Sequence, residues 1–76
     1  PDCQVLVEKV LNADVAFAGG NLIAQIVGCE LSVARQVMER LPTQIPCLLY
    51  RHQAHHLIRQ LNRARVYSRL VAPVSS

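Results

Sequence analysis

Residues 28–42 read GCELSVARQVMERLP and predict a helix with one apolar face, from about residue 31 to residue 41. Its apolar side chains recur every three or four positions and therefore share one side of a helix. They are Leu31, Ala34, Val37, Met38 and Leu41. Pro42 disfavours a helical residue before it and so ends this helix. Gly28 suits the end of an earlier helix, for which Asn21 is a good N-cap.

Strands are predicted on both sides of this helical pair. Residues 3–7 place their apolar side chains on alternate positions, as a half-buried strand does. A helix over residues 2–11 is the competing interpretation. Residues 43–51 predict a second strand, in which Pro46 cannot donate a ladder hydrogen bond. Residues 66–71 predict a third strand.

A third helix is predicted over residues 53–63, and the pair Gly19-Gly20 is expected to be a flexible join. The order is β-α-α-β-α-β, which predicts an α+β fold. We expect a small two-layer sandwich, with a three-stranded sheet and three helices on one face. Residues 1–72 are expected to form one domain, and residues 73–76 a flexible C-terminal tail.

Composition narrows the functional classes. Hydrophobic residues make up 51% of the 76 residues and charged residues only 17%. That is little charge for so small a chain, so we expect apolar surface to be covered by a partner or by a second copy. No apolar run is long enough to span a bilayer. The three cysteines are odd in number and form no CxxC pair, which favours reduced thiols in a cytoplasmic protein.

No site for metal, cofactor or catalysis is predicted. Cys47, His52, His55 and His56 are the nearest approach to a metal site, but they lack the convergent spacing of four zinc ligands. The five acidic residues form no carboxylate pair at a defined spacing, and no serine lies in a nucleophile elbow. A chain this short also has little room for a substrate pocket. We therefore expect neither an enzyme nor a small-molecule substrate.

Two interaction surfaces are predicted instead. The first is the helical hairpin around Arg35, with Ser32 and Gln36 beside it. Arg35 is also one turn from Glu39, where an ion pair is expected. The second is an apolar outer side of the second strand, formed by Leu48 and Tyr50. Both surfaces suit a protein partner or self-association.

Nucleic-acid binding is the alternative function. The net charge is +3, all five acids precede position 40, and four arginines follow position 58. Arg59 and Arg63 lie in one row of the third predicted helix with His52 and His56, where they could hold phosphates. Alternatively, the two earlier helices could form a helix-turn-helix, whose second helix would expose Ser32, Arg35, Gln36 and Arg40 to DNA.

The chain resembles the C-terminal domain of the bacterial ribosomal stalk protein and the related ClpS-type adaptors. Gly28, Leu31, Ala34 and Glu39 match the stalk family's Gly-Leu-Gly-Leu-Lys-Glu-Ala-Lys-x-Leu-Val-Glu run, Arg35 keeps a basic charge, and Pro42 falls where that helix ends. Downstream, Ala54, Leu57, Leu61 and Ala64 follow the spacing of the family's third helix. The resemblance covers about residues 5–70. It implies this fold and a general adaptor role, with binding through the first two helices.

Overall fold

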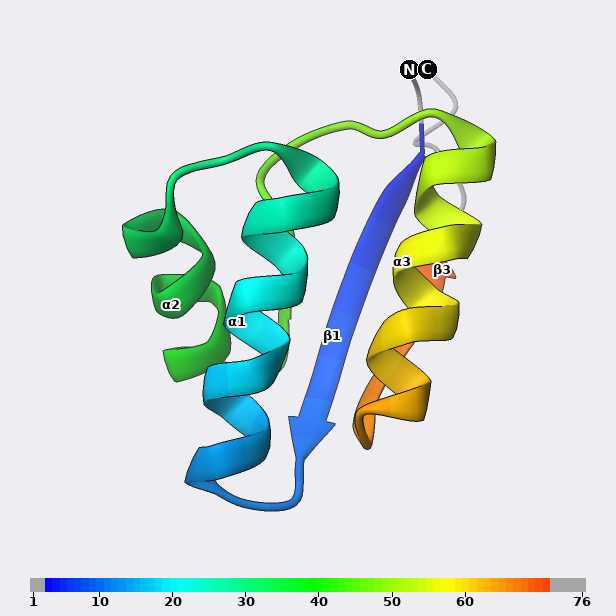
Figure 1. The fold of residues 1–76 in the computed structure, drawn as a ribbon. Coiled ribbons are helices and arrows are strands. Elements are labelled where there is room, and N and C mark those ends of the chain that lie inside the picture. The colour runs from blue at the N-terminus through cyan, green and yellow to red at the C-terminus, as the bar shows by residue number, and fades with distance from the viewer. Residues whose placement is uncertain (1–2, 72–76) are drawn as a thin grey trace.

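Within residues 3–71 the fold consists of a three-stranded antiparallel sheet and three helices, whose arrangement can be followed in Figure 1. The computed structural model describes residues 3–71. The elements are β1 (Gln4–Val10), α1 (Ala13–Val27), α2 (Leu31–Glu39), β2 (Thr43–Gln44), α3 (Arg51–Arg63) and β3 (Val66–Val71). Their order confirms the predicted α+β fold. The predicted C-terminal tail lies outside the described residues.

β1 is the central strand, and the sheet order is β2-β1-β3. β3 pairs with β1 along its whole length, from Gln4 opposite Val71 to Val10 opposite Val66. The register shifts between Val7 and Lys9, where the strand bulges. The competing prediction of a helix over residues 2–11 is therefore wrong. Strand formation wins because alternate residues of β1 face the core.

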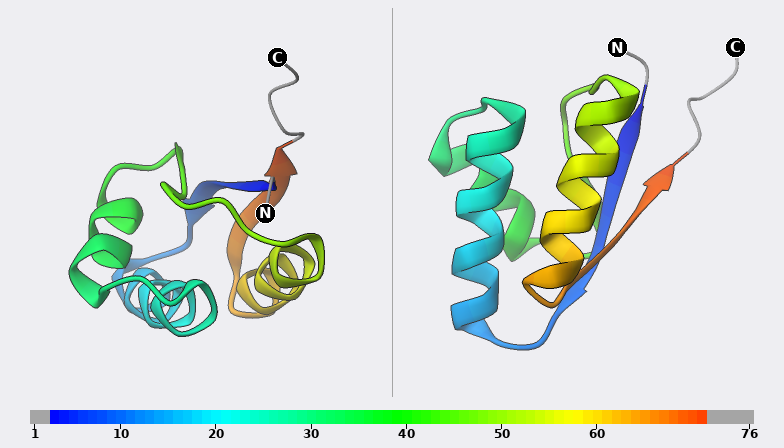
Figure 2. Two further views of the ribbon diagram at one scale, coloured as in Figure 1. Left: turned by 90° about the horizontal axis from the view of Figure 1, so that it is seen from above. Right: turned by 45° about the vertical axis from the view of Figure 1, so that its right-hand side comes forward.

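The helices lie on one face of the sheet (Figure 2). α1 and α3 pack beside each other, and α2 packs mainly against α1. α1 begins where the Asn12 side chain accepts a hydrogen bond from the Val15 N–H at 2.9 Å. It ends at Gly28, which adopts the left-handed conformation with φ 84°, as predicted for a helix C-cap.

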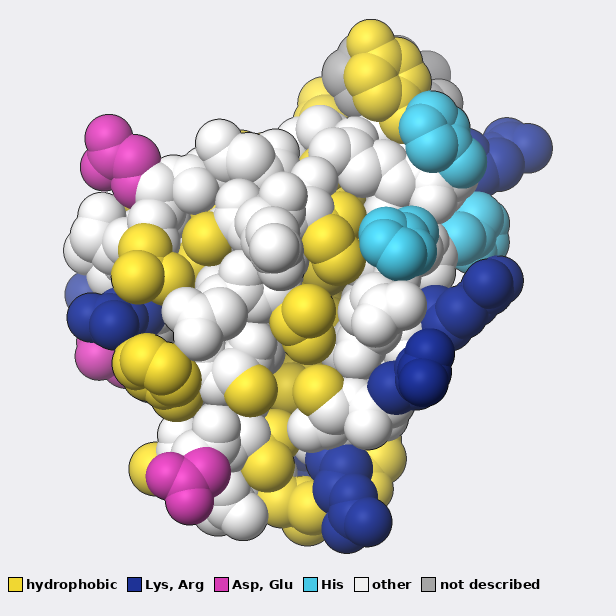
Figure 3. All heavy atoms as spheres, viewed as in Figure 1, with side chains coloured by type: hydrophobic (Ala, Val, Ile, Leu, Met, Phe, Trp, Pro, Cys, Tyr) yellow, Lys and Arg dark blue, Asp and Glu magenta, His cyan; other side chains and the backbone are white. Residues whose placement is uncertain are grey.

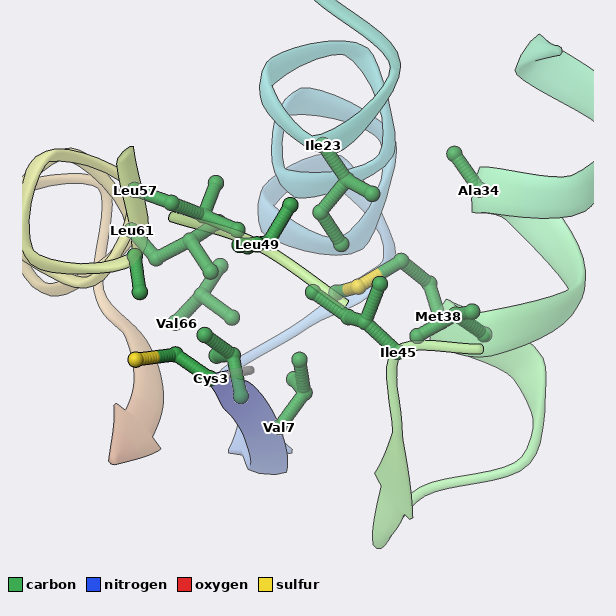
Figure 4. Packing of buried hydrophobic residues seen from close by; sticks show 13 residues of the cluster. Cys3, Val7, Ile23, Ala34, Met38, Ile45, Leu49, Leu57, Leu61 and Val66 are labelled. Atoms are coloured by element: carbon green, nitrogen blue, oxygen red, sulfur yellow. The ribbon is translucent and has the colours of Figure 1, made fainter. Parts of the chain in front are cut away.

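The core lies between the sheet and the helices (Figure 4). β1 contributes Val5 and Val7, which are fully buried, and α3 contributes Leu57 and Leu61. Ile23 of α1 reaches the same cluster. Each fully buried aliphatic side chain stabilises the fold by about 1.5–3 kcal/mol relative to an exposed one. These contacts hold the outer faces of α1, α2 and α3 in fixed positions.

Gly19 and Gly20 lie inside α1 and are buried, so the predicted flexible join, and a first helix beginning only after Asn21, are wrong. A Cβ on Gly19 would lie 2.9 Å from both Met38 Cε and Val66 Cγ2. The glycine therefore permits α1 to approach both α2 and β3. Close packing, and not chain flexibility, explains the glycine at position 19.

The predicted second strand over residues 43–51 is mostly wrong. β2 has only two residues, and the chain then leaves the sheet at Pro46, which has no N–H to donate. It returns at Leu49, whose N–H donates to the Cys3 carbonyl at 2.8 Å. The predicted alternation nevertheless holds, because Leu49 is buried while Leu48 and Tyr50 are 52% and 57% exposed. Those two side chains belong to the connection before α3.

Candidate functional site

A groove runs between α1 and α2 and has a volume of about 340 Å³. Both helices line it: Ala13, Ala16 and Phe17 come from α1, and Arg35, Met38 and Glu39 come from α2. On each helix the second and third of these residues follow the first by three and four positions, so each set lies on one helical face. The two alanines have little side chain to fill the space between the helices. The groove is large enough to receive one or two partner side chains.

Phe17 and Arg35 form the most distinctive contact in the groove. The Arg35 guanidinium carbon lies 5.3 Å from the centroid of the Phe17 ring, within the range of a cation–π interaction. Phe17 is 56% exposed, so the ring presents apolar surface to solvent. An exposed pair of this kind contributes about 0.5–1 kcal/mol. The contact orients a positive charge at the edge of an apolar surface.

The predicted ion pair between Arg35 and Glu39 does not form. Within residues 3–71 the one ion pair joins Arg69 Nε to Glu8 Oε1 at 2.7 Å. Arg35 turns to Phe17 of the neighbouring helix instead, because an exposed ion pair one turn apart is worth only about 0.3–0.5 kcal/mol. The groove therefore carries a cation and a carboxylate that are both available to a partner.

Ser32 and Gln36, the other predicted residues of α2, are exposed but lie outside this groove. The Ser32 hydroxyl is 3.5 Å from a Glu30 carboxylate oxygen. Gln36 lines a second, smaller hollow of about 150 Å³ together with Arg40 and residues around β2. Arg35 and Gln36 thus lie on adjoining faces of α2, about 100° apart, and line different hollows.

Arg59 and Arg63 lie on the outward face of α3. Figure 3 shows basic and histidine side chains gathered along this side of the molecule. The exposed members are Arg51, His52, His55, His56, Arg59 and Arg63. The opposite face of α3 is buried through Ala54, Leu57 and Leu61. No group of three or more potential metal ligands converges anywhere in residues 3–71.

Leu48 and Tyr50 adjoin the start of α3 and not the α1–α2 groove. The Tyr50 ring stacks on His52, with 6.0 Å between ring centroids and an interplanar angle of 15°. Gln53 fixes this end of α3, because its Nε2 donates to the Ile26 carbonyl of α1 at 2.9 Å. The predicted partner-binding residues therefore divide between α2, where Arg35 and Gln36 line different hollows, and α3 with the connection before it.

Cys29 and Cys47 are half-buried free thiols. Burial raises the pKa of the Cys29 thiol above its ordinary value, and the negative charge of an ionised Cys47 raises it further. A raised pKa keeps the thiol protonated and less nucleophilic near neutral pH. Cys29 thus resembles a small apolar side chain that packs against the core.

Sequence reasoning missed Ala13, Ala16 and Phe17, since it started the first helix after Gly20. Asn12 followed by Asp14 was a usable signal, because an asparagine N-cap and an acidic first turn are typical of a helix start. A helix starting there places Phe17 one turn after Ala13. Phe17 would then have been a candidate for an exposed aromatic residue.

Comparisons with known proteins add no relative. No protein family, characterised protein or solved structure matches this chain at a significant level. The resemblance to the stalk domain and to ClpS-type adaptors therefore stays a prediction. No helix within residues 3–71 is long and apolar enough to cross a membrane.

Proposed function

We propose that this chain is a non-enzymatic protein-interaction domain, and that the groove between α1 and α2 binds a segment of a partner protein. The observation that carries this proposal is the exposed Phe17 ring, with Arg35 held over it at the edge of a groove. Aromatic and arginine side chains dominate the binding energy of protein interfaces. An adaptor role agrees with the resemblance to the stalk domain, whose first two helices bind its partners.

The groove selects a partner by its chemistry. Ala16, Met38 and Phe17 offer apolar surface that suits an aliphatic or aromatic side chain. Arg35 has no carboxylate partner within residues 3–71, so an acidic residue next to that apolar side chain would complete its hydrogen bonding. We therefore infer that the partner segment combines one large apolar residue with an adjacent Asp or Glu.

A matched pair of surface contacts makes the test specific. Lys9 Nζ lies 5.1 Å from the Tyr67 ring centroid on the sheet, which parallels the Phe17–Arg35 contact in the groove. Tyr67 is 46% exposed, close to the 56% of Phe17. Tyr67→Ser is therefore the control for Phe17→Ser, since each removes an exposed ring. Lys9→Glu is the control for Arg35→Glu, since each makes the same change of charge.

The experiment is quantitative affinity capture from the source cell, followed by calorimetry with each purified partner. We expect Phe17→Ser and Arg35→Glu each to weaken binding by about tenfold or more, as interface anchors do. The two control variants should bind as the unmodified chain does. A set of captured proteins that is unchanged by Phe17→Ser and Arg35→Glu would refute the proposal.

Self-association is tested separately by sedimentation velocity. A dimer that dissociates on Phe17→Ser would identify the occupant of the groove as a second copy. A dimer that dissociates on Leu48→Asp, with Phe17→Ser unaffected, would instead assign self-association to the exposed residues before α3.

A further inference from the structure

α3 presents a cationic surface that the α1–α2 groove does not use. It has 13 residues, so its outer face is about 20 Å long. Six exposed cationic or titratable side chains cover that face: Arg51, His52, His55, His56, Arg59 and Arg63. Their positions fall within less than half of the helical circumference at 100° per residue. The result is one continuous strip, in which Arg51, Arg59 and Arg63 carry the formal positive charge.

No acidic side chain within residues 3–71 compensates this strip. Glu8 lies on β1, where it pairs with Arg69. Asp14, Glu30 and Glu39 belong to α1 and α2 or to their flanks, and Figure 3 shows acidic side chains on that side of the molecule. An uncompensated strip concentrates anions near the surface and accelerates their association. The strip therefore fits a polyanionic partner.

An aromatic side chain lies at one end of the strip. Tyr50 immediately precedes α3, is 57% exposed and stacks on His52 with an interplanar angle of 15°. An exposed aromatic ring beside a line of cations is the combination by which proteins hold single-stranded nucleic acid. The bases stack on the ring while the backbone follows the charges.

We propose that α3 binds single-stranded nucleic acid, with Arg51, Arg59 and Arg63 on three of its backbone phosphates and Tyr50 stacked on a base. Arginine suits this role because its guanidinium group hydrogen-bonds phosphate in a bidentate geometry. A membrane surface fits less well, because the apolar face of α3 is already buried in the core. An acidic protein would use the same charges but would not need the exposed ring of Tyr50.

This proposal is independent of the groove. α1 lies between α2 and α3 in Figure 1, and the strip faces away from α2. Variants of the strip leave Phe17 and Arg35 intact. The two proposals can therefore fail separately.

The test is fluorescence anisotropy with fluorescein-labelled 12-nucleotide dT and U probes at 50–200 mM NaCl. For three phosphate contacts we expect a slope of about −2 when the logarithm of the association constant is plotted against the logarithm of the salt concentration. Each contact on a single strand contributes about −0.7 to this slope. Raising the salt fourfold should then weaken binding by about twentyfold. Arg59→Glu/Arg63→Glu should remove most of the binding and leave a slope of about −0.7, because one phosphate contact remains. Tyr50→Ala should weaken binding by about tenfold without changing the slope.

The control variant is Lys9→Glu/Arg69→Glu, which makes the same change in net charge on the sheet, away from both α3 and the groove. Binding that survives in this control but not in the α3 variant supports the proposal. Three results would overturn it: no anisotropy change at 50 mM NaCl, equal losses in the two double variants, or equally strong competition by polyglutamate. Circular dichroism checks that each variant is folded, and Arg59→Gln/Arg63→Gln replaces the charge reversal if that variant unfolds.

Discussion

Substituting the two adjacent glycines of α1 should have opposite effects on stability. In an exposed helix, either Gly→Ala change would stabilise by about 1 kcal/mol, because alanine has the higher helix propensity. At Gly20 the nearest atom to a new Cβ outside its own helix is Met38 Cγ at 3.8 Å, which is an ordinary contact. Gly20→Ala should therefore stabilise the domain by about 0.5–1 kcal/mol.

Gly19→Ala meets a different environment. The new Cβ would lie 2.9 Å from Met38 Cε and 2.9 Å from Val66 Cγ2, well inside the 3.5–4.0 Å of normal carbon contacts. Met38 can rotate away, but Val66 is β-branched, fully buried and fixed in β3. Overpacking of this kind costs about 1–3 kcal/mol. After the gain in helix propensity, we expect a net loss of about 1 kcal/mol.

Urea denaturation followed by circular dichroism at 222 nm measures both variants. Because the helix-propensity gain is common to them, the difference between Gly19→Ala and Gly20→Ala isolates the packing cost, which should be about 1–3 kcal/mol. In a domain of this size each kcal/mol shifts the melting temperature by about 4–8 °C. Equal stability of the two variants would refute the close approach of α1 to Val66.

Three further predictions concern single side chains. Asn12→Ala should lower the free energy of unfolding by about 1 kcal/mol, measured by thermal melting, because it removes the N-cap of α1; unchanged melting would contradict the cap. Gln53→Ala should lower the free energy of unfolding by about 1 kcal/mol, measured by urea denaturation, because the Ile26 carbonyl loses the hydrogen bond donated by the Gln53 side chain. An unaltered denaturation midpoint would argue against a stabilising role for this hydrogen bond. Cys29 should react with iodoacetamide at pH 8 more slowly in the folded chain than in urea, as followed by mass spectrometry, since burial raises its pKa. The folded chain holds the Cys29 proton more tightly than the unfolded chain does. The contribution of Cys29 to the free energy of unfolding should therefore fall as the pH rises past the pKa of the thiol in the unfolded chain.

Sequence patterns correctly predicted the helices and strands whose buried residues recur at a regular spacing. α2 and α3 each have one apolar stripe at helical spacing, and β3 occupies the predicted residues. The N-terminal half of α1 was missed because its glycines are there for packing, and that role depends on Met38 and Val66, distant in sequence. The length of β2 was overestimated because Ile45 and Leu49 are buried at alternate positions, as in a strand, although they lie after its last residue.

The candidate site was predicted only in part. Arg35 was identified from its place on the outer side of α2, but its contact with Phe17 depends on how α1 and α2 pack together. Side chains on two different helices have no fixed spacing in the sequence. The same reason explains the wrong prediction for Glu39, which was paired with Arg35 because both belong to one helix.

The pairing of Gln4 with Val71 brings the two ends of the described chain together. Opposite residues of antiparallel strands have Cα atoms only about 4.5–5.5 Å apart. A few glycine residues would therefore suffice to join these ends, and new termini could be opened in the turn between α1 and α2 without disturbing the sheet. For the same reason, the whole unit could be inserted into a surface loop of a host protein without forcing the host's flanking segments apart.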